Sequence, residues 1–379
     1  MPSVARTPLL LALLFVAPSL QAQLNPVEQL RSFAEAIAPA AARQAIAGLA
    51  ARAEVRGPRG ALVSEMLSLD DGTARFRLVK DGEVTDRLLV GGRPYQRSGT
   101  ANLGKEPFLA AEAAMASFVR GHEVHRMLLD LDRRFLPDDR ATTPGCLALR
   151  GPDALAVTLC HAADSDLPGT LELELPAAAG GGSVTLEFAD WRPLLGVRLP
   201  FAVDFVHAGE RHAYRYTAVL PFRLAPGAPL PTGSDAPELL YDRLGDLAQL
   251  AAAHERVLEA HRRSDIALLL ADAAERSTSS GRGVLQESGR DELAARLGPY
   301  FASTRFHRYD DVVPPVVAIS ADGSLGWLAC QIEAAGTQLS PTGAAEPVAF
   351  GFSWVELYAR KNGDWRAIGN ASSALPGNS

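Results

Sequence analysis

The stretch YDRLGDLAQLAAAHERVLEAHRRSD, residues 241–265, decides the architecture that we expect for the second half of the chain. Six of its side chains recur at steps of three and four, which places them on one stripe of an α-helix: Leu247, Leu250, His254, Leu258, His261 and Asp265. The arginines, Arg243 among them, mostly fall elsewhere, as on a solvated face. Because the stripe is apolar except for two imidazoles and a carboxylate, the helix either lines a pocket with them or satisfies them internally.

The elements that follow this helix have a distinctive order. The sequence predicts short helices over 266–275 and 290–301, and then long strands over 315–335 and 347–373, with a hairpin turn at Asn362-Gly363. This order resembles the NTF2-like superfamily, in its SnoaL-like and DUF4440-type branch. The matching segments are AHERVLEAHRRSD at 253–265, ISADGSLGW at 319–327 and WVELYARKNGDWRAIGNASS from 354. The resemblance implies an α+β domain over 238–374, a cone-shaped half-barrel with helices around one apolar cavity.

Aromatic residues and one carboxylate are the candidates for the cavity wall. They are Tyr300, Phe306, Trp327, Phe352, Trp354 and Glu356. An aromatic stripe is also what an ordinary core shows, whereas Glu356 on an aromatic strand face is costly to bury without a partner.

Three residues of the helix are candidates for catalysis. His254 and His261 suit acid–base chemistry near neutral pH, or they are hydrogen-bonded core histidines. Asp265 either orients the His261 imidazole or caps the next helix. We expect Glu356 to be the partner of His254 across the cavity. The Tyr/Asp arrangement of ketosteroid isomerases is not visible in the sequence, which argues against catalysis.

The first half of the chain has a different pattern. Residues 27–52 and 106–135 read as helix, and alternating strands occupy most of 61–98 and 146–219. The segments DGEVTDRLLVGGRPY and VTLEFADWRPLLGVRLPFAVDF resemble the LolA/LolB-like lipoprotein carriers. The resemblance implies a curved antiparallel sheet over 24–224 around an apolar ligand. Residues 225–237, APGAPLPTGSDAP, read as a linker between the two domains.

Residues 1–22 have the features of a cleaved signal peptide, with a basic Arg6, an apolar run and a small residue before Gln23. We therefore expect an exported protein, periplasmic or secreted. Export favours a disulfide between Cys146 and Cys160, on opposing strands of a predicted hairpin, and the alternative is two half-buried thiols. Cys330 reads as a small core residue.

Several functions are disfavoured. The net charge of -7 gives no basic face for nucleic acid, and no later stretch suits a membrane span. The sequence HEVH at 122–125 has its histidines three apart instead of four, so we expect no metal, and no nucleotide or cofactor motif occurs.

Three hypotheses remain. The first is an exported protein that binds an apolar or lipid-like small molecule in the second cavity or the first sheet, without catalysis. The second is a SnoaL-like enzyme (an isomerase, dehydratase or hydrolase) that uses His254, His261 and Asp265. The third is an assembly module that forms a homodimer through its NTF2-like sheet.

Overall fold

The computed structural model of the chain describes residues 25–58, 60–91, 93–98, 103, 123–140, 142–151, 155–163, 165–175, 182–227, 230, 237–281 and 283–374. The predicted signal peptide (1–22), most of the predicted linker, and residues 106–122 of a predicted helix lie outside these residues. Within the described residues, no helix combines the length and the apolar character needed to cross a membrane.

The first sheet is antiparallel throughout. Its strands are β1 (Gly48–Gly57), β2 (Gly60–Leu69), β3 (Ala74–Lys80), β4 (Glu83–Val90), β5 (Arg93–Ser98), β6 (Leu136–Pro137), β7 (Cys146–Arg150), β8 (Ala156–His161), β9 (Pro168–Glu174), β10 (Ser183–Leu194), β11 (Val197–His207) and β12 (Glu210–Leu224). They pair in the order β5-β4-β3-β2-β1-β12-β11-β10-β9-β8-β7-β6.

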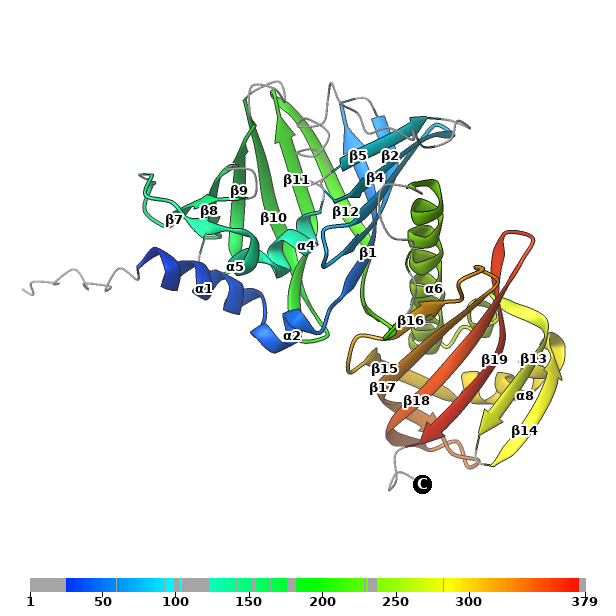
Figure 1. Cartoon of the computed structure of the whole chain (residues 1–379). Coiled ribbons are helices and arrows are strands. Elements are labelled where there is room, and N and C mark those ends of the chain that lie inside the picture. Colours follow the sequence, from blue (N-terminus) through cyan, green and yellow to red (C-terminus); the bar gives the residue numbers. More distant parts are fainter. Residues whose placement is uncertain are drawn as a thin grey trace, which may run out of the picture.

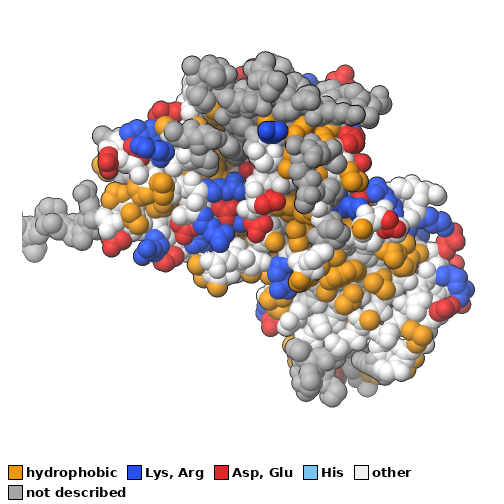
Figure 2. All heavy atoms as spheres, in the orientation of Figure 1, with side chains coloured by type: hydrophobic (Ala, Val, Ile, Leu, Met, Phe, Trp, Pro, Cys, Tyr) orange, Lys and Arg blue, Asp and Glu red, His pale blue; other side chains and the backbone are white. Residues whose placement is uncertain are grey.

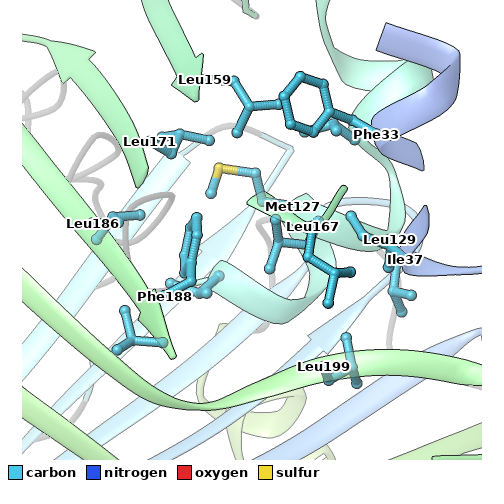
Figure 3. Packing of buried hydrophobic residues seen from close by; sticks show 14 of the residues in the cluster. Phe33, Ile37, Met127, Leu129, Leu159, Leu167, Leu171, Leu186, Phe188 and Leu199 are labelled. Carbon is cyan, nitrogen blue, oxygen red and sulfur yellow. The ribbon is translucent and has the colours of Figure 1, made fainter. Parts of the chain in front are cut away.

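Short helices fill one face of this sheet. They are α1 (Pro26–Ile37), α2 (Ala40–Gln44), α4 (Val124–Leu129) and α5 (Leu131–Arg134). Figure 3 shows Phe33 and Ile37 of α1, with Met127 and Leu129 of α4, among the leucines of the strands. These side chains form one buried cluster, so the interior that we expected to hold a ligand is largely packed with the protein's own residues in the part described.

The second sheet follows the long helix α6 (Pro237–Arg263) and the short α7 (Ile266–Leu269). It consists of β13 (Ala273–Gly281), β14 (Val284–Gly289), β15 (Thr304–Asp311), β16 (Val316–Ile319), β17 (Leu325–Leu339), β18 (Ala345–Lys361) and β19 (Asp364–Ala374), with α8 (Arg290–Ser303) between β14 and β15. The pairing order is β14-β13-β19-β18-β17, and β15 and β16 both pair with the far edge of β17. The predicted turn at Asn362-Gly363 joins β18 to β19, and both of its residues have a positive φ.

Helix α6 lies between the two sheets (Figure 1). One buried cluster contains Leu67 and Leu88 of the first sheet, Leu244 and Leu250 of α6, and Leu328 of the second sheet. In addition, the end of β12 pairs in parallel with β16. The two sheets therefore share a core, although their strands follow one another separately along the chain.

Three predictions from periodicity need correction. The predicted helix over 266–275 ends at Leu269, and β13 begins at Ala273. The predicted helix over 27–52 ends early, because β1 begins at Gly48 and pairs with both β2 and β12. There, strand pairing prevails over the helical preference of an alanine-rich segment. Arg243 is 5 % exposed instead of solvated, and it donates to the backbone carbonyls of Ser320 and Ala321.

Candidate functional site

A cavity of about 330 Å³ lies between α6, α7 and α8 on one side and β13, β18 and β19 on the other. Its apolar lining comes from leucines of α7 and α8 and from aromatic residues of the sheet: Leu268, Leu269, Leu293, Leu297, Tyr309, Phe352 and Trp354. Its polar lining includes His261, Glu356, Tyr358, Asn370 and Ser372. This volume is at the lower end of the range for small-molecule sites.

Glu356 and Tyr358 form the polar pair of this cavity. They are two positions apart on β18, so strand alternation places both side chains on the face toward the helices. The Tyr358 hydroxyl donates to Glu356 Oε2 at 2.7 Å, and the Trp354 side chain also hydrogen-bonds to the carboxyl group. Burial raises the pKa of Glu356 despite these hydrogen bonds and the nearby His254. Burial, together with the neighbouring Glu356, also raises the pKa of Tyr358. The pair can therefore offer both a hydrogen-bond donor and an acceptor to a ligand.

His261 lines the same cavity with its ring stacked on Tyr309, the ring centroids 4.1 Å apart. Its Nδ1 lies 2.8 Å from the Val257 carbonyl, which fixes the tautomer with the proton on Nδ1. Burial lowers the pKa of His261 to about 4. The imidazole is therefore neutral near pH 7, and Nε2 is an acceptor of low basicity.

His254 has a different hydrogen-bond partner from the one that we expected. It is 3 % exposed, and its Nε2 lies 2.8 Å from Asp311 Oδ2 at the end of β15. Glu356 is thus not its hydrogen-bond partner, although its charge acts on the imidazole. Burial tends to lower the pKa of His254, but Asp311, Glu356 and Glu255 outweigh burial and raise it. Among the described residues, neither His254 Nδ1 nor Asp311 Oδ1 has a hydrogen-bond partner.

The His254–Asp311 pair faces a second hollow, not the first cavity. This hollow, of about 580 Å³, lies between α6 and β15 on one side and the β10–β11 turn and β12 on the other. Cys330 completes a group with the pair, because donor atoms of the three residues lie within 4.8 Å of one another. Zinc accepts such a set, but burial raises the pKa of the Cys330 thiol, which opposes the thiolate that a metal requires.

The other expected site residues do not gather in the cavity. Asp265 accepts a hydrogen bond from the Leu268 amide and caps α7, at the end of the helix stripe. Tyr300 and Phe306 belong to an aromatic cluster around His261, outside the set that lines the cavity. Trp327 pairs with Leu357 on the outer face of the second sheet, because the inward positions of β17 are Gly326, Leu328 and Cys330.

A disulfide joins Cys146 and Cys160 on the paired strands β7 and β8.

In the HEVH segment, His122 lies outside the described residues. His125 is fully buried with Nε2 2.8 Å from the Pro200 carbonyl, and burial lowers its pKa to about 4. It packs α4 against β11 and against the Tyr216 ring of β12.

Sequence reasoning missed two members of these sites, Asp311 and Tyr358. Tyr358 could have been found, since alternation along β18 places it on the same face as Glu356. Asp311 carries no such signal, because its position beside His254 depends on how β15 crosses α6.

No protein-family model matches the chain, and no curated protein matches it. Among solved structures, the chain is similar to an NTF2-like protein of unknown function in nutrient uptake from Rhodospirillum rubrum, with 19% identity over 33% of this chain and 98% of that one, at a TM-score of 0.27. It is similar to a ketosteroid isomerase-like protein from Erwinia carotovora, with 22% identity over 34% and 96% of the two chains, at a TM-score of 0.29. A protein with a cystatin-like fold from Caulobacter vibrioides has 14% identity over 34% and 89%, at a TM-score of 0.28.

Proposed function

We propose that the cavity under α6, α7 and α8 binds a small, mainly apolar molecule that carries one hydrogen-bonding oxygen. The observation that carries the proposal is the carboxyl group of Glu356, which is held by Tyr358 beside leucine and aromatic side chains. The other carboxyl group in the lining, Asp272, is already paired with Arg256. Apolar walls with few polar groups are typical of small-molecule sites. A carboxyl group with a raised pKa keeps its proton to higher pH, so it can donate to a carbonyl or hydroxyl oxygen of the ligand.

Binding of this kind requires no chemical step. His261 is a weak base and Asp265 is engaged as a helix cap, so two of the three residues expected to perform catalysis are unsuited to it. His254 is bonded to Asp311 and faces the other hollow.

The test is a ligand-observed NMR screen of small cyclic ketones and alcohols against the folded protein. Leu297→Trp, which fills the cavity, should abolish binding of the hits. Leu285→Trp is the matched control, because Leu285 is 73 % exposed and does not line the cavity. Glu356→Leu should weaken the binding of compounds that carry an oxygen more than it weakens the binding of matched hydrocarbons. Equal binding to Leu297→Trp and wild type would exclude this cavity.

An enzyme is the second candidate, favoured by the raised pKa of Glu356. A carboxyl group whose pKa is raised by burial can give a proton to a bound carbonyl compound and take one from it. Exchange of the α-hydrogens of a bound ketone with deuterium from the solvent, lost in Glu356→Gln, would support catalysis. Retention of the hydrogens supports binding alone.

A homodimer through the second sheet is the third candidate. Leu325, Val355 and Leu357 are 51 %, 37 % and 45 % exposed on the outer face of β17 and β18, beside the half-buried Trp327. Figure 2 shows hydrophobic side chains gathered on this part of the molecule. Exposed apolar groups that adjoin one another are typical of a contact surface.

We also propose that the chain is exported, on the basis of residues 1–22 and the bonded cysteines. We propose further that residues 24–224 are related to the LolA/LolB-like carriers and 238–374 to SnoaL-like domains. Supporting observations are the long antiparallel sheet with helices on one face and the order of α6 to β19.

A further inference from the structure

A third hollow, of about 600 Å³, lies between the first sheet and α6 and contains an arginine with no visible partner. Arg75 on β3 is 6 % exposed. Its guanidinium lies over the Tyr241 ring, 4.4 Å from the centroid. Among the residues that the structure describes, none forms a hydrogen bond or an ion pair within 4.0 Å with Arg75, and its Nε is fully buried and unsatisfied.

This is unusual because the guanidinium always carries a charge and five N–H donors. A buried charge without partners is strongly unfavourable. The other deeply buried arginines of the first half obey this rule. Arg126 donates to the Asp130 carboxylate and the Ile46 carbonyl, and Arg43 donates to Asp132 and the carbonyls of Ala38 and Leu129.

The carboxylates around the hollow are mostly engaged elsewhere. Asp246, whose charge acts on Arg75, accepts from Arg360 and Trp365. Asp272 is ion-paired with Arg256, and Asp364 is ion-paired with Arg366. Glu255 is ion-paired with Arg262. Glu65 lies directly between Arg52 and Arg77 in the strand register, and Arg77 also lies 3.8 Å from the Asp86 carboxylate, so both carboxylates of this row have other arginines beside them.

The backbone makes room for the guanidinium. Gly245 lies in the interior of α6, where glycine costs about 1 kcal/mol relative to alanine. A Cβ atom at Gly245 would lie 3.3 Å from Cζ and Nε of Arg75. Part of the remaining wall is small and apolar, formed by Ala50, Ala248 and Ala252, whereas other parts carry paired charged side chains such as Arg256 and Asp272.

We propose that this hollow binds a small organic anion whose carboxylate or phosphate oxygens pair with Arg75. Two oxygens of either group match the planar fork of a guanidinium, and Arg77 and Arg52 at the rim add attraction. The alanine walls accommodate an apolar remainder. The hollow adjoins the Glu356 cavity and shares Ala253, Arg256 and Asp272 with its lining, but Arg75 does not line that cavity. The proposal does not depend on the function of the Glu356 cavity.

The experiment measures binding by calorimetry and melting temperature at constant ionic strength. The probes are octanoate and inorganic phosphate, with octanamide as the uncharged match of octanoate. The variants are Arg75→Met, Gly245→Ala and the control Arg56→Met, whose side chain is exposed on β1 and does not line the hollow. Octanoate, phosphate or both should bind to wild type and Arg56→Met, and octanamide should not. Octanoate binding alone identifies a carboxylate amphiphile, and phosphate binding alone identifies a phosphate group.

Arg75→Met should lower the affinity for the anion by about tenfold or more, which is the effect of losing one charge-assisted hydrogen bond. Without anion, it should melt at the same temperature as wild type or higher, because an unpaired buried charge has been removed. Gly245→Ala should lower the affinity for the anion, because the added methyl group crowds the guanidinium. If Arg75→Met does not fold, the affinity of Gly245→Ala tests the proposal instead. Unchanged affinity in the variants, no anion binding to wild type, or a lower melting temperature of anion-free Arg75→Met would overturn the proposal.

Discussion

Replacement of His254 by leucine tests how α6 is fixed to the second sheet. The His254 ring is buried, its Nε2 is bonded to Asp311 Oδ2 at 2.8 Å, and Trp354 lies beside it with ring centroids 5.8 Å apart. Leucine nearly preserves the volume. It leaves the Asp311 carboxylate, whose side chain is 8 % exposed, without its hydrogen-bond donor.

The expected loss is large. Removal of one partner from a buried charged pair costs about 3–5 kcal/mol, because the other charge remains desolvated. The double variant His254→Leu/Asp311→Leu removes both groups and should recover most of this loss, to within about 1 kcal/mol of wild type or above it. Exposed His307, on the same strand as Asp311, provides the control: His307→Leu should change the free energy of unfolding by less than about 0.5 kcal/mol.

The assay is urea unfolding followed by tryptophan fluorescence at pH 6, with wild type, His254→Leu, Asp311→Leu and the double variant compared. If His254→Leu is as stable as wild type, or if the double variant is as unstable as the single one, the reasoning is wrong.

The same assay has a predicted pH dependence. His254 has a raised pKa in the folded protein, so its contribution is fully present below the unfolded value of about 6.5. The contribution is lost as pH rises through the folded pKa. The free energy of unfolding of wild type, relative to that of the double variant, should therefore fall from pH 6 toward pH 9, and a relative value that rises with pH would contradict the pairing.

Three other predictions follow from the fold. A non-reduced digest of exported protein, alkylated at lysis, should contain the peptides of Cys146 and Cys160 joined by a disulfide. Free thiols at both cysteines would contradict the proposal that the protein is exported and its cysteines oxidised. The fragment 238–374 should show a cooperative melt, at a lower temperature than the full chain because its α6 loses the first sheet. A fragment that shows no melting transition would contradict the independent folding of residues 238–374. If the outer face of the second sheet forms a dimer, Leu357→Glu should halve the mass in light scattering. The matched control Leu136→Glu, at an exposed leucine on β6 of the first sheet, should not. An unchanged mass in Leu357→Glu would exclude that interface.

Much of the fold could be predicted from periodicity. The helix stripe at Leu247, Leu250, His254 and Leu258 is buried as expected, because steps of three and four on a helix leave few alternatives. The turn at Asn362-Gly363 occurs where predicted, since this dipeptide tolerates positive φ. Strand β1 was missed because its alanines and arginines carry little β-preference of their own, and only its two neighbours make it a strand.

The site was less predictable, because it depends on contacts between distant segments. The expected partner of His254 was Glu356, whereas β15 brings Asp311 to it. Trp327 faces outward because Gly326, its neighbour, takes the inward position against Leu250, where a Cβ would come within 2.7 Å of the leucine. The broad burial of α6, including Arg243, arises because the helix has a sheet on each side, a fact that no single helix pattern contains.

The most direct test of the proposed function is an intermolecular NOE experiment on a hit from the ligand screen, with leucine methyl groups labelled. The account predicts NOEs from the bound molecule to the methyl groups of Leu293 and Leu297 on α8, which line the cavity beside Glu356. NOEs only to Leu325 and Leu357 on the outer face, or only to leucines of the first sheet such as Leu186, would contradict it.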